Sequence, residues 1–213
     1  MSTDRAPLTR QRIAAAALRF VDEHGEAALS MRKLGAELGV EAMSLYNHVA
    51  NKDDLLDAVG ELLYVEVLEA YAPDPEGSWH DDLREMAVVY RAAAHRHPNA
   101  LPILIDRVTS SPVKYEFLAR CYSIFTKAGF DTKTAALAFD ISASWVVGAI
   151  RQEVGLMAQL EAHGQPLSRS ELPPELQGVV DFTNACLAWS PTQRFEFGLE
   201  TVVAGLERRL ADG

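Results

Sequence analysis

The residues "LGVEAMSLYNHVANKDDLL" (38–56) contain a short, polar segment between a glycine and the start of a longer helix. The segment between Gly39 and the clear helix start at Asn51 is short, and isolated helices below roughly 12–15 residues are marginal in water. It nevertheless carries a group of hydrogen-bonding side chains: Ser44, Tyr46, Asn47 and His48. We therefore expect a helix that its neighbours hold in place and whose outer face is free to be polar.

Counted from Met31 as the first position, this region has the spacing of a helix-turn-helix. The apolar positions that would press both helices onto a supporting helix are filled by Leu34, Leu38, Val40 and Leu45. Gly35 stands where only a small residue lets the two helices cross closely, and Gly39 stands where the turn requires a conformation that glycine adopts without strain. The second helix of such a unit can enter the major groove of DNA. A solvated surface helix is the alternative, and Glu41 favours it, because a carboxylate at the groove repels phosphate.

The rest of the chain shows only helical periodicity, so the predicted class is all-α. Expected helices start after Thr9, Ser30, Asn51, Ser111 and Ser190, and further helices are expected over 79–97 and 132–163. Their expected ends are Gly25, Gly39, Tyr71, Gly129 and Leu210. The stretch 164–175 is the most linker-like. We divide the chain into a helix-turn-helix domain (8–50), a connecting helix (52–71) and a larger helical domain (72–213).

Composition limits the function further. The 213 residues are 48% hydrophobic and carry a net charge of −10, which argues against general nucleic-acid binding. Residues 1–52 escape this acidity, with seven Lys or Arg against six Asp or Glu. No apolar run approaches the roughly 18–20 residues of a membrane span, and no secretory signal is visible. We expect a cytoplasmic protein without a membrane partner, with Cys121 and Cys186 as buried thiols.

The stretch from Leu8 to about Gly60, which includes the ending Leu45-Tyr46-x-His48-Val49-x-x-Lys52, resembles the DNA-binding domain of the TetR family of bacterial transcriptional regulators. A weaker likeness to tetracycline-repressor-type C-terminal domains continues through "SWHDDL" and the "GF" at 129–130. The resemblance implies a homodimeric, mostly repressing protein that binds a double-stranded DNA operator. It also implies a larger domain that binds a small-molecule inducer.

Carried over by position, the family's DNA contacts fall on three groups of residues. The helix that crosses the DNA backbone would open with Ser30, Met31, Arg32 and Lys33. The side chains that face base edges would be Ala42, Met43, Ser44 and Asn47. The phosphate contacts would be Tyr46, His48 and Lys52. Ala42 and Met43 suit thymine methyl groups better than bidentate hydrogen bonds.

The resemblance also implies positions for the ligand pocket: Met86, Tyr90, Leu104, Arg107, Phe117, Arg120 and Trp145. The alternative is that these residues are ordinary core. Leu104 stands where tetracycline repressors have the histidine that binds the drug's magnesium, and Gln152 stands near their second-shell glutamate. We therefore do not expect tetracycline–Mg²⁺ as the inducer. An apolar or aromatic molecule with an anionic group near Arg107 or Arg120 is our expectation.

In the family, two long helices of each subunit form the dimer interface, and the matching stretches are about 134–163 and 191–210. Five residues mark the expected interface: Gly148, Gly155, Gly198, Val202 and Gly205. Small residues at these positions allow close approach of helices. Local packing inside one subunit is the alternative.

Two further possibilities remain from the sequence. "SMRK" (30–33) and "SPVK" (111–114) fit the Ser-x-x-Lys pair of some acyl-transfer enzymes, so a small helical hydrolase is a remote alternative, although both serines also fit helix N-caps. A regulator that answers to a protein partner, or to no ligand, is the other. His95 and His97 lie on different helix faces, which argues against a metal, and no phosphate-binding loop or dinucleotide motif appears. We expect no enzyme activity, cofactor or metal.

Overall fold

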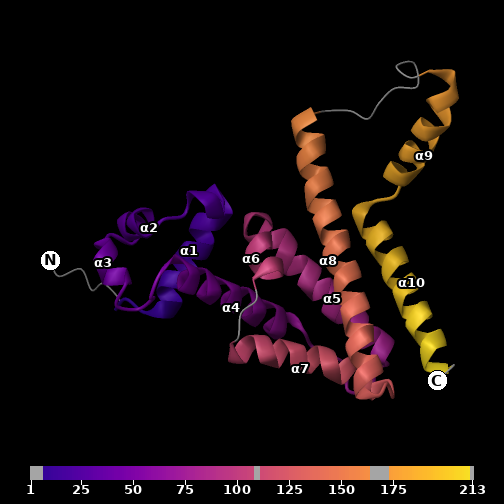
Figure 1. Cartoon of the computed structure of the whole chain (residues 1–213), viewed down its shortest axis with the longest axis horizontal. Coiled ribbons are helices and arrows are strands. Elements are labelled where there is room, and N and C mark those ends of the chain that lie inside the picture. Colours follow the sequence, from indigo (N-terminus) through magenta and orange to yellow (C-terminus); the bar gives the residue numbers. More distant parts are fainter. Residues whose placement is uncertain (1–6, 108–110, 164–172, 212–213) are drawn as a thin grey trace. The chain divides into compact units, whose positions relative to one another are not determined.

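The chain is helical throughout the described residues. The computed structural model describes residues 7–107, 111–163 and 173–211, and these ranges contain no strand. Packing divides the chain into two compact units, Met1–Ala128 and Gly129–Gly213 (Figure 1). The first unit contains α1 (Arg10–His24), η1 (Glu26–Ala28), α2 (Met31–Leu38), α3 (Ala42–Leu45), α4 (Lys52–Ala70), α5 (Trp79–Arg96), η2 (Pro98–Ala100), α6 (Leu101–Asp106) and α7 (Pro112–Lys127). The second contains α8 (Thr132–His163), η4 (Pro174–Leu176), α9 (Gln177–Ala188) and α10 (Pro191–Ala211). The predicted all-α class is confirmed.

Side-chain caps fix the helix starts where the sequence predicts them. Ser30 Oγ accepts from the amide of Lys33 at 3.3 Å, and Asn51 Oδ1 accepts from the amide of Asp54 at 2.9 Å. The Ser190 capping box is complete, because Gln193 Oε1 accepts from the Ser190 amide at 2.9 Å and the Gln193 amide donates to Ser190 Oγ at 3.2 Å. Thr9 and Ser111 cap α1 and α7 in the same way. Each cap satisfies an amide that the helix itself leaves unpaired.

Short helices escaped prediction. The six-residue α6 is held by burial of Leu101, Ile103 and Leu104, and it is too short to show a helical period in the sequence. Helix α9 follows the linker-like stretch 164–175, of which only 173–175 lie within the described residues. Neither helix has a side-chain cap at its start. Without a cap or a long apolar stripe, such helices form only because tertiary packing selects them.

Helix α4 joins the head, by which we mean α1–α3, to the helices that follow. It packs against α1 at one end and against α5, α6 and α7 further along (Figure 1). Its buried residues include Leu55, Val59, Leu63 and Val67. Because α4 shares a core with both neighbours, the chain packs as one unit as far as Ala128. The compact units therefore divide at a different place from the predicted domains, whose boundary at residues 50–72 stays a prediction about function.

In the second unit, α8 and α10 pack side by side (Figure 1). Phe195, Leu199 and Leu206 of α10 are buried, and the rings of Trp145 and Phe195 lie 5.3 Å apart. Several large apolar side chains of this unit stay exposed: Leu137, Ile141, Leu176, Val179, Phe182, Trp189 and Phe197. By length and composition alone, Thr132–Gly155 is apolar enough to cross a membrane. The sequence expectation of no such run was wrong on this measure, because isolated charges such as Asp140 and Arg151 barely lower the average.

Candidate nucleic-acid interface and effector site

The turn of the helix-turn-helix has the predicted glycine geometry. Gly39 adopts a left-handed conformation with φ +65°, and the Gly39 and Val40 amides donate to the carbonyls of Ala36 (3.1 Å) and Gly35 (2.8 Å). This pattern is a Schellman motif, which satisfies the last carbonyls of α2. A Cβ on Gly35 would lie 2.9 Å from the Val40 carbonyl oxygen and 3.2 Å from the Ala42 amide nitrogen. Both glycines are therefore required for the crossing of α2 and α3.

Helix α3 is held from inside and exposes its tip. Leu45 and Val49 are buried, at 0% and 1% exposure, and anchor the segment to the head. The helix proper is only four residues long, and the following turn is closed by the Val49 amide donating to the Leu45 carbonyl at 3.1 Å. The exposed predicted DNA contacts on it are Met43, Tyr46, Asn47 and His48, while Ala42 and Ser44 are half-buried. The segment thus presents mixed apolar and polar side chains to the outside.

The predicted contacts at the start of α2 differ from one another. Met31 is buried and its side chain packs in the core, so the predicted DNA contact at this position would have to come from its backbone. Its neighbours Arg32 and Lys33 are exposed, and Ser30 Oγ is occupied as the N-cap. A helix start alternates in this way because the residue at the first position packs against the core while the next two point outward.

Both lysines among the predicted DNA contacts have partners within the head. Lys33 Nζ donates to the Ala28 carbonyl at 3.0 Å, and Lys52 Nζ donates to the Glu26 carbonyl at 3.2 Å. Both carbonyls belong to η1. The two ammonium groups therefore flank η1, between the exposed start of α2 and the start of α4.

An ion pair joins the beginning of α1 to the beginning of α4. Arg10 Nη2 lies 2.7 Å from Asp54 Oδ1, and Arg10 Nη1 donates to Asp54 Oδ2 at 2.8 Å. The Ala50 amide also donates to Asp54 Oδ2, at 2.7 Å. The hydrogen bond from Arg10, followed by that from the Ala50 amide, lowers the pKa of the Asp54 carboxyl. The sequence gives no local sign of this pair, because Arg10 and Asp54 are 44 residues apart.

A second polar link joins α1 and α4 to the η2 turn. His97 Nδ1 lies 2.8 Å from Asp22 Oδ2, and His97 Nε2 lies 3.0 Å from Glu66 Oε2. Asn99 Nδ2 donates to the Asp22 carbonyl at 2.7 Å. His97 is thus a structural link between the head and the segment that leads into α6.

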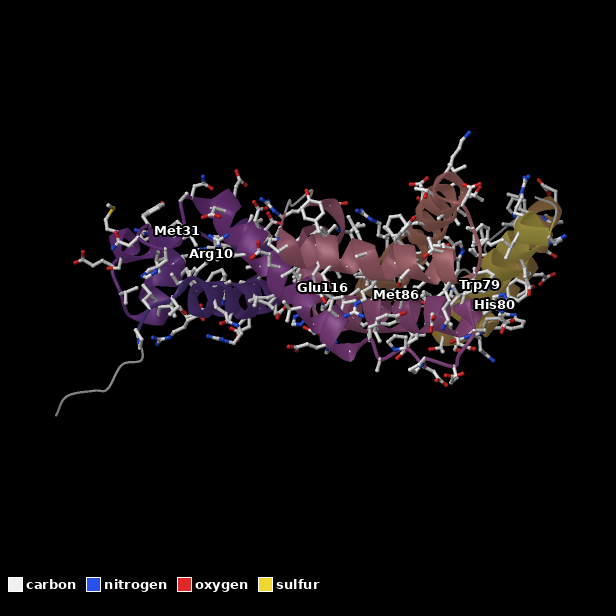
Figure 2. The ribbon with its side chains drawn as sticks, turned by 90° about the horizontal axis from the view of Figure 1, so that it is seen from below. Arg10, Met31, Trp79, His80, Met86 and Glu116 are labelled. Atoms are coloured by element: carbon white, nitrogen blue, oxygen red, sulfur yellow. The ribbon has the colours of Figure 1, made fainter. Side chains whose placement is uncertain are left out.

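Three of the predicted pocket residues come together where α4, α5, α6 and α7 meet. The Tyr90 and Phe117 rings lie 5.9 Å apart, and the Tyr90 hydroxyl donates to the Leu104 carbonyl at 3.4 Å. Met86 is buried one turn before Tyr90 on α5 (Figure 2). Tyr64 of α4 completes the group, with its ring 5.0 Å from Phe117 and its hydroxyl donating to the Leu104 carbonyl at 3.1 Å. We call Tyr64, Tyr90, Leu104, Lys114 and Phe117 the aromatic cluster.

The remaining predicted pocket residues are not in this cluster. Arg107 pairs with α4, because its Nη2 lies 2.8 Å from Asp57 Oδ1 and donates to the Asp53 carbonyl at 3.0 Å. Arg120 is 54% exposed and pairs with Glu116 along the surface of α7, at 3.4 Å. Trp145 belongs to the other compact unit. Neither arginine is therefore available in the aromatic cluster as the expected partner of an anion.

Lys114 is the charged member of the aromatic cluster, and the sequence did not identify it. Its Nζ donates to the Tyr64 hydroxyl and lies 5.5 Å from the centre of the Phe117 ring. Burial lowers the pKa of Lys114, and it raises the pKa of both Tyr64 and the nearby Cys121 to about 12. The available signal was "SPVK", which places Lys114 in the first turn of α7, but that motif was interpreted as a helix N-cap followed by an exposed lysine, with a nucleophile–base pair as the remote alternative.

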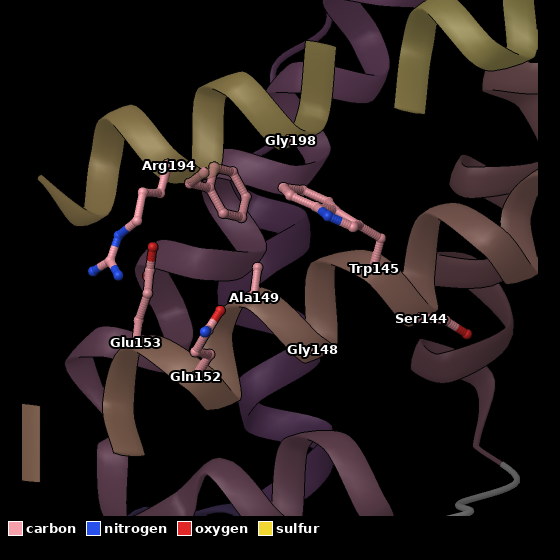
Figure 3. A pocket seen from close by; sticks show the side chains of 9 residues that line it. Ser144, Trp145, Gly148, Ala149, Gln152, Glu153, Arg194 and Gly198 are labelled. Atoms are coloured by element: carbon pink, nitrogen blue, oxygen red, sulfur yellow. The ribbon is translucent and has the colours of Figure 1, made fainter. Parts of the chain in front are cut away.

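The second unit contains a cavity of about 410 Å³ between α8 and α10 (Figure 3). Its lining consists of Ser144, Trp145, Gly148, Ala149, Gln152, Glu153, Arg194, Phe195 and Gly198. A Cβ on Gly198 would collide with the indole of Trp145, so this glycine is required by packing inside the chain. A Cβ on Gly148, Gly155 or Gly205 would meet no atom within 4 Å, and Val202 is half-buried. The alternative of local packing therefore applies to Gly198, and the other three glycines face open space.

Comparisons with known proteins agree with this arrangement. The family model described as "Tetracyclin repressor-like, C-terminal domain" matches residues 72–210, and the model "Bacterial regulatory proteins, tetR family" matches residues 13–59. Tetracycline repressor protein class D of Escherichia coli is 28% identical over 206 residues, which cover 96% of this chain and 92% of that protein.

Relatives from Streptomyces are similar at comparable levels. The HTH-type transcriptional repressor DrrR1 of Streptomyces coeruleorubidus is 30% identical, with 94% of this chain and 77% of that protein covered. The crystal structure of the Streptomyces coelicolor TetR family protein ActR in complex with (S)-DNPA is 32% identical, with a TM-score of 0.77 and coverage of 95% of this chain and 98% of that one. Two of these relatives are repressors and one was crystallised with a small molecule, which supports a ligand-responsive transcriptional regulator. The chain therefore belongs to the TetR family of bacterial transcriptional regulators.

Proposed function

We propose that the protein is a cytoplasmic, homodimeric repressor that binds a palindromic operator and releases it when a small molecule binds in the body, by which we mean α5–α7 and the second unit. The observation that carries the proposal is the tip of α3. Its buried anchors, Leu45 and Val49, fix a segment whose outward side chains have no other task within the described head. Such a rigid, exposed second helix matches what major-groove reading requires.

At the operator, the exposed tip would divide its work between bases and phosphates. Met43 and Ala42 supply apolar contacts to thymine methyl groups, while Ser44 and Asn47 supply hydrogen bonds to base edges. Arg32, Tyr46 and His48 are exposed around this tip and would contact phosphates, together with the Ser30 end of α2. Lys33 and Lys52 would join them by turning from the η1 carbonyls that they hold in the free protein. Phosphate contacts of this kind set position and salt dependence rather than sequence.

The dimer would form through α8 and α10. A Cβ on Gly148, Gly155 or Gly205 would meet no atom within 4 Å, and Val202 of α10 is half-buried. The exposed Phe182 and Phe197 provide apolar area that a second copy would cover. A dimer places its two recognition helices about 34–36 Å apart, which is one turn of DNA, and so reads a palindrome.

Effector binding would act through α4. Tyr64 of the aromatic cluster and Asp57, the partner of Arg107, both lie on this helix, whose first residues support the head. A ligand that moved α6 or α7 would shift α4 and change the spacing of the recognition helices. Relatives support a ligand in the body, since ActR was crystallised in complex with (S)-DNPA and with actinorhodin. Ligand and DNA binding would then oppose each other by one coupling energy, typically about 1–3 kcal/mol.

The other candidates have less support. In both Ser-x-x-Lys motifs the serine hydroxyl caps a helix, and the lysine ammonium binds elsewhere: Lys33 to the Ala28 carbonyl and Lys114 to the Tyr64 hydroxyl. In neither pair does the lysine ammonium hydrogen-bond to the serine hydroxyl, as the activation of a serine nucleophile requires. A regulator controlled by a protein partner remains the second candidate, and the exposed aromatic side chains of α9 and α10 are the observation that favours it.

Selection of bound fragments from a random DNA pool at two salt concentrations tests the proposal. We expect a palindrome with half-sites one turn apart. With that operator, Asn47→Ala should cost about 1–3 kcal/mol and relax specificity at one position, whereas Lys52→Met should weaken all sequences equally and reduce the salt slope by about 1. Recovery of no motif, or of a motif without two-fold symmetry, would contradict the proposal.

A further inference from the structure

The aromatic cluster contains a positive charge without a negative partner. Lys114 is half-buried, and its ammonium is within hydrogen-bonding distance of the Tyr64 hydroxyl and 3.9 Å from the centre of the Tyr64 ring. Among the residues that the structure describes, no carboxylate lies within ion-pair distance of Lys114. Lys127, further along the same helix, shows the contrast, because its ammonium lies 3.0 Å from Asp82. A partly buried cation without a carboxylate is costly unless another ligand completes it.

The groups around Lys114 are aromatic or neutral. Tyr64, Tyr90 and Phe117 form its walls, and all three rings are buried. The raised pKa values of Tyr64 and Tyr90 keep both hydroxyls protonated at neutral pH, so each remains a hydrogen-bond donor. The cluster thus offers flat apolar walls and one ammonium to a ligand. Its only strong acceptor is the Leu104 carbonyl, which both hydroxyls already share.

We propose that Lys114 receives an anionic oxygen of a planar aromatic effector, whose rings pack against Phe117 and Tyr90. This assignment rests on the proposed function, because it specifies the ligand of the same body. It replaces Arg107 and Arg120 as the receptors of the anion, since the first is paired with Asp57 and the second with Glu116 on the surface. A carboxylate, sulfonate or phenolate would supply the charge that the cluster lacks.

The position of Lys114 also connects the ligand to the head. Its present partner, the Tyr64 hydroxyl, belongs to α4, and α4 carries the head at its other end. When the ammonium turns to the ligand, Tyr64 keeps only its bond to the Leu104 carbonyl. Binding of the anion therefore changes a contact of α4 directly, without a relay through further residues.

Two probes with the same ring system test the assignment. 8-Anilinonaphthalene-1-sulfonate carries an anion, and N-phenyl-1-naphthylamine lacks it; both become fluorescent in apolar sites. We expect the full-length protein to prefer the sulfonate, and Lys114→Met to lower its affinity at least about tenfold while changing that of the neutral probe by no more than about twofold. Lys114→Arg keeps the charge and should retain the preference. Arg120→Met removes an exposed charge from the same helix and should leave both affinities unchanged.

Several outcomes would overturn the assignment. These are no preference for the sulfonate in the wild type, an equal loss for both probes in Lys114→Met, or an equal loss of sulfonate affinity in Arg120→Met. Operator binding by the same proteins is measured separately. An intact operator complex together with a sulfonate affinity that ignores Lys114 would sink the assignment and leave the proposed function standing.

A measurement on the wild type covers the case in which Lys114→Met does not fold. Because burial lowers the pKa of Lys114 from its ordinary 10.5, sulfonate affinity should fall at a lower pH than an exposed lysine would cause. The titratable groups around it are Tyr64, Tyr90 and Cys121, whose raised pKa values keep them neutral there, and Asp106 lies near Tyr90. The neutral probe should bind equally throughout. A sulfonate affinity that stays constant up to pH 10.5 would refute the role of Lys114.

Discussion

Leu34, Leu45 and Val49 of the head are fully buried within one chain, whereas Phe182, Trp189 and Phe197 of the second unit are 71%, 51% and 66% exposed. In the head, Gly35 and the turn at Gly39 let α2 and α3 cross closely enough to bury these side chains. The second unit has long helices of good propensity and leaves its aromatic side chains uncovered. The difference indicates that the head is finished as a monomer, while α8–α10 present a surface that a second copy would complete.

Exposed apolar residues therefore have different meanings in the two regions. In the described head, the large apolar side chains that are exposed are Met43 and Tyr46, both at the α3 tip. Such residues are normal on surfaces, and Met43 suits contact with a thymine methyl group. In the second unit, Phe182, Trp189 and Phe197 lie on consecutive helices, and the rings of Trp189 and Phe197 are 6.3 Å apart. A group of this kind indicates a macromolecular interface.

The largest expected effect is a loss of stability in the head. Gly35→Leu would force a side chain against the Val40 carbonyl oxygen, so we expect the free energy of unfolding to fall by about 3 kcal/mol or more, with loss of DNA binding. Urea unfolding and operator binding measure both. Gly178→Ala is the control in the second unit, where a methyl group meets no atom within 4 Å and the free energy of unfolding should not fall. Normal operator binding by Gly35→Leu would show that the crossing of α2 and α3 does not require a glycine.

The second prediction concerns the exposed aromatic side chains of the second unit. Phe197→Glu should leave the subunit folded but raise the dimer dissociation constant by about two orders of magnitude or more, because an unpaired carboxylate in an apolar interface costs several kcal/mol. Sedimentation over a range of protein concentrations measures this. Tyr122→Glu places the same charge at an exposed site of α7 and should not alter assembly. Equal dimerisation of the wild type and Phe197→Glu would show that α10 is not the interface.

A smaller effect is expected at the joint between α6 and α4. A double-mutant cycle with Arg107→Gln and Asp57→Asn should give a coupling energy of about 1 kcal/mol, since the Arg107 side chain is 23% exposed. The same cycle on Arg120 and Glu116, both more than half exposed, should give about 0.3–0.5 kcal/mol. Unfolding free energies of the four variants of each cycle provide the comparison. The reverse order would show that the α4–α6 ion pair does not strengthen the joint.

The smallest effect is a pH dependence within the head. Because Arg10 and the Ala50 amide lower the pKa of folded Asp54 below 3.8, their stabilisation is fully present above that value and is lost as the pH falls through the folded pKa. Asp54→Asn should therefore be less stable than the wild type at pH 6, and the difference should shrink towards pH 2.5. Urea unfolding across this range measures it. Glu41→Gln, at an exposed site near the turn, should follow the wild-type curve, and a constant gap for Asp54→Asn would contradict the prediction.

The sequence predicted most of the fold because its signals are local. Ser30, Asn51 and Ser190 lie three residues from the amides that they cap, and Gly35 and Gly39 lie within one turn of the contacts that require them. The helix α6 was missed because it has neither a cap nor a full period. Met31 was placed on the DNA by its position in the motif, although an apolar first residue of α2 belongs to the core.

The candidate effector site was less predictable. Tyr90, Leu104 and Phe117 lie together, as the resemblance implied, whereas Arg107 and Arg120 lie outside their cluster, and the ligand contacts stay a prediction. Arg107 was expected near an anionic ligand and instead pairs with Asp57, fifty residues earlier in the chain. Lys114 was dismissed as an exposed lysine and instead reaches Tyr64. No local pattern in the sequence distinguishes these two outcomes.

Local sequence therefore specified the long helices, their caps and the glycine turn between α2 and α3, because each depends on atoms within a few residues. The tertiary structure alone decided which polar groups are neutralised. Arg10 meets Asp54, Arg107 meets Asp57 and Lys114 meets no carboxylate in the described chain. It also decided which glycines are covered, since Trp145 fills the space over Gly198 and nothing fills that over Gly205. Charge pairing and close packing act through space, so residues distant in sequence determine both.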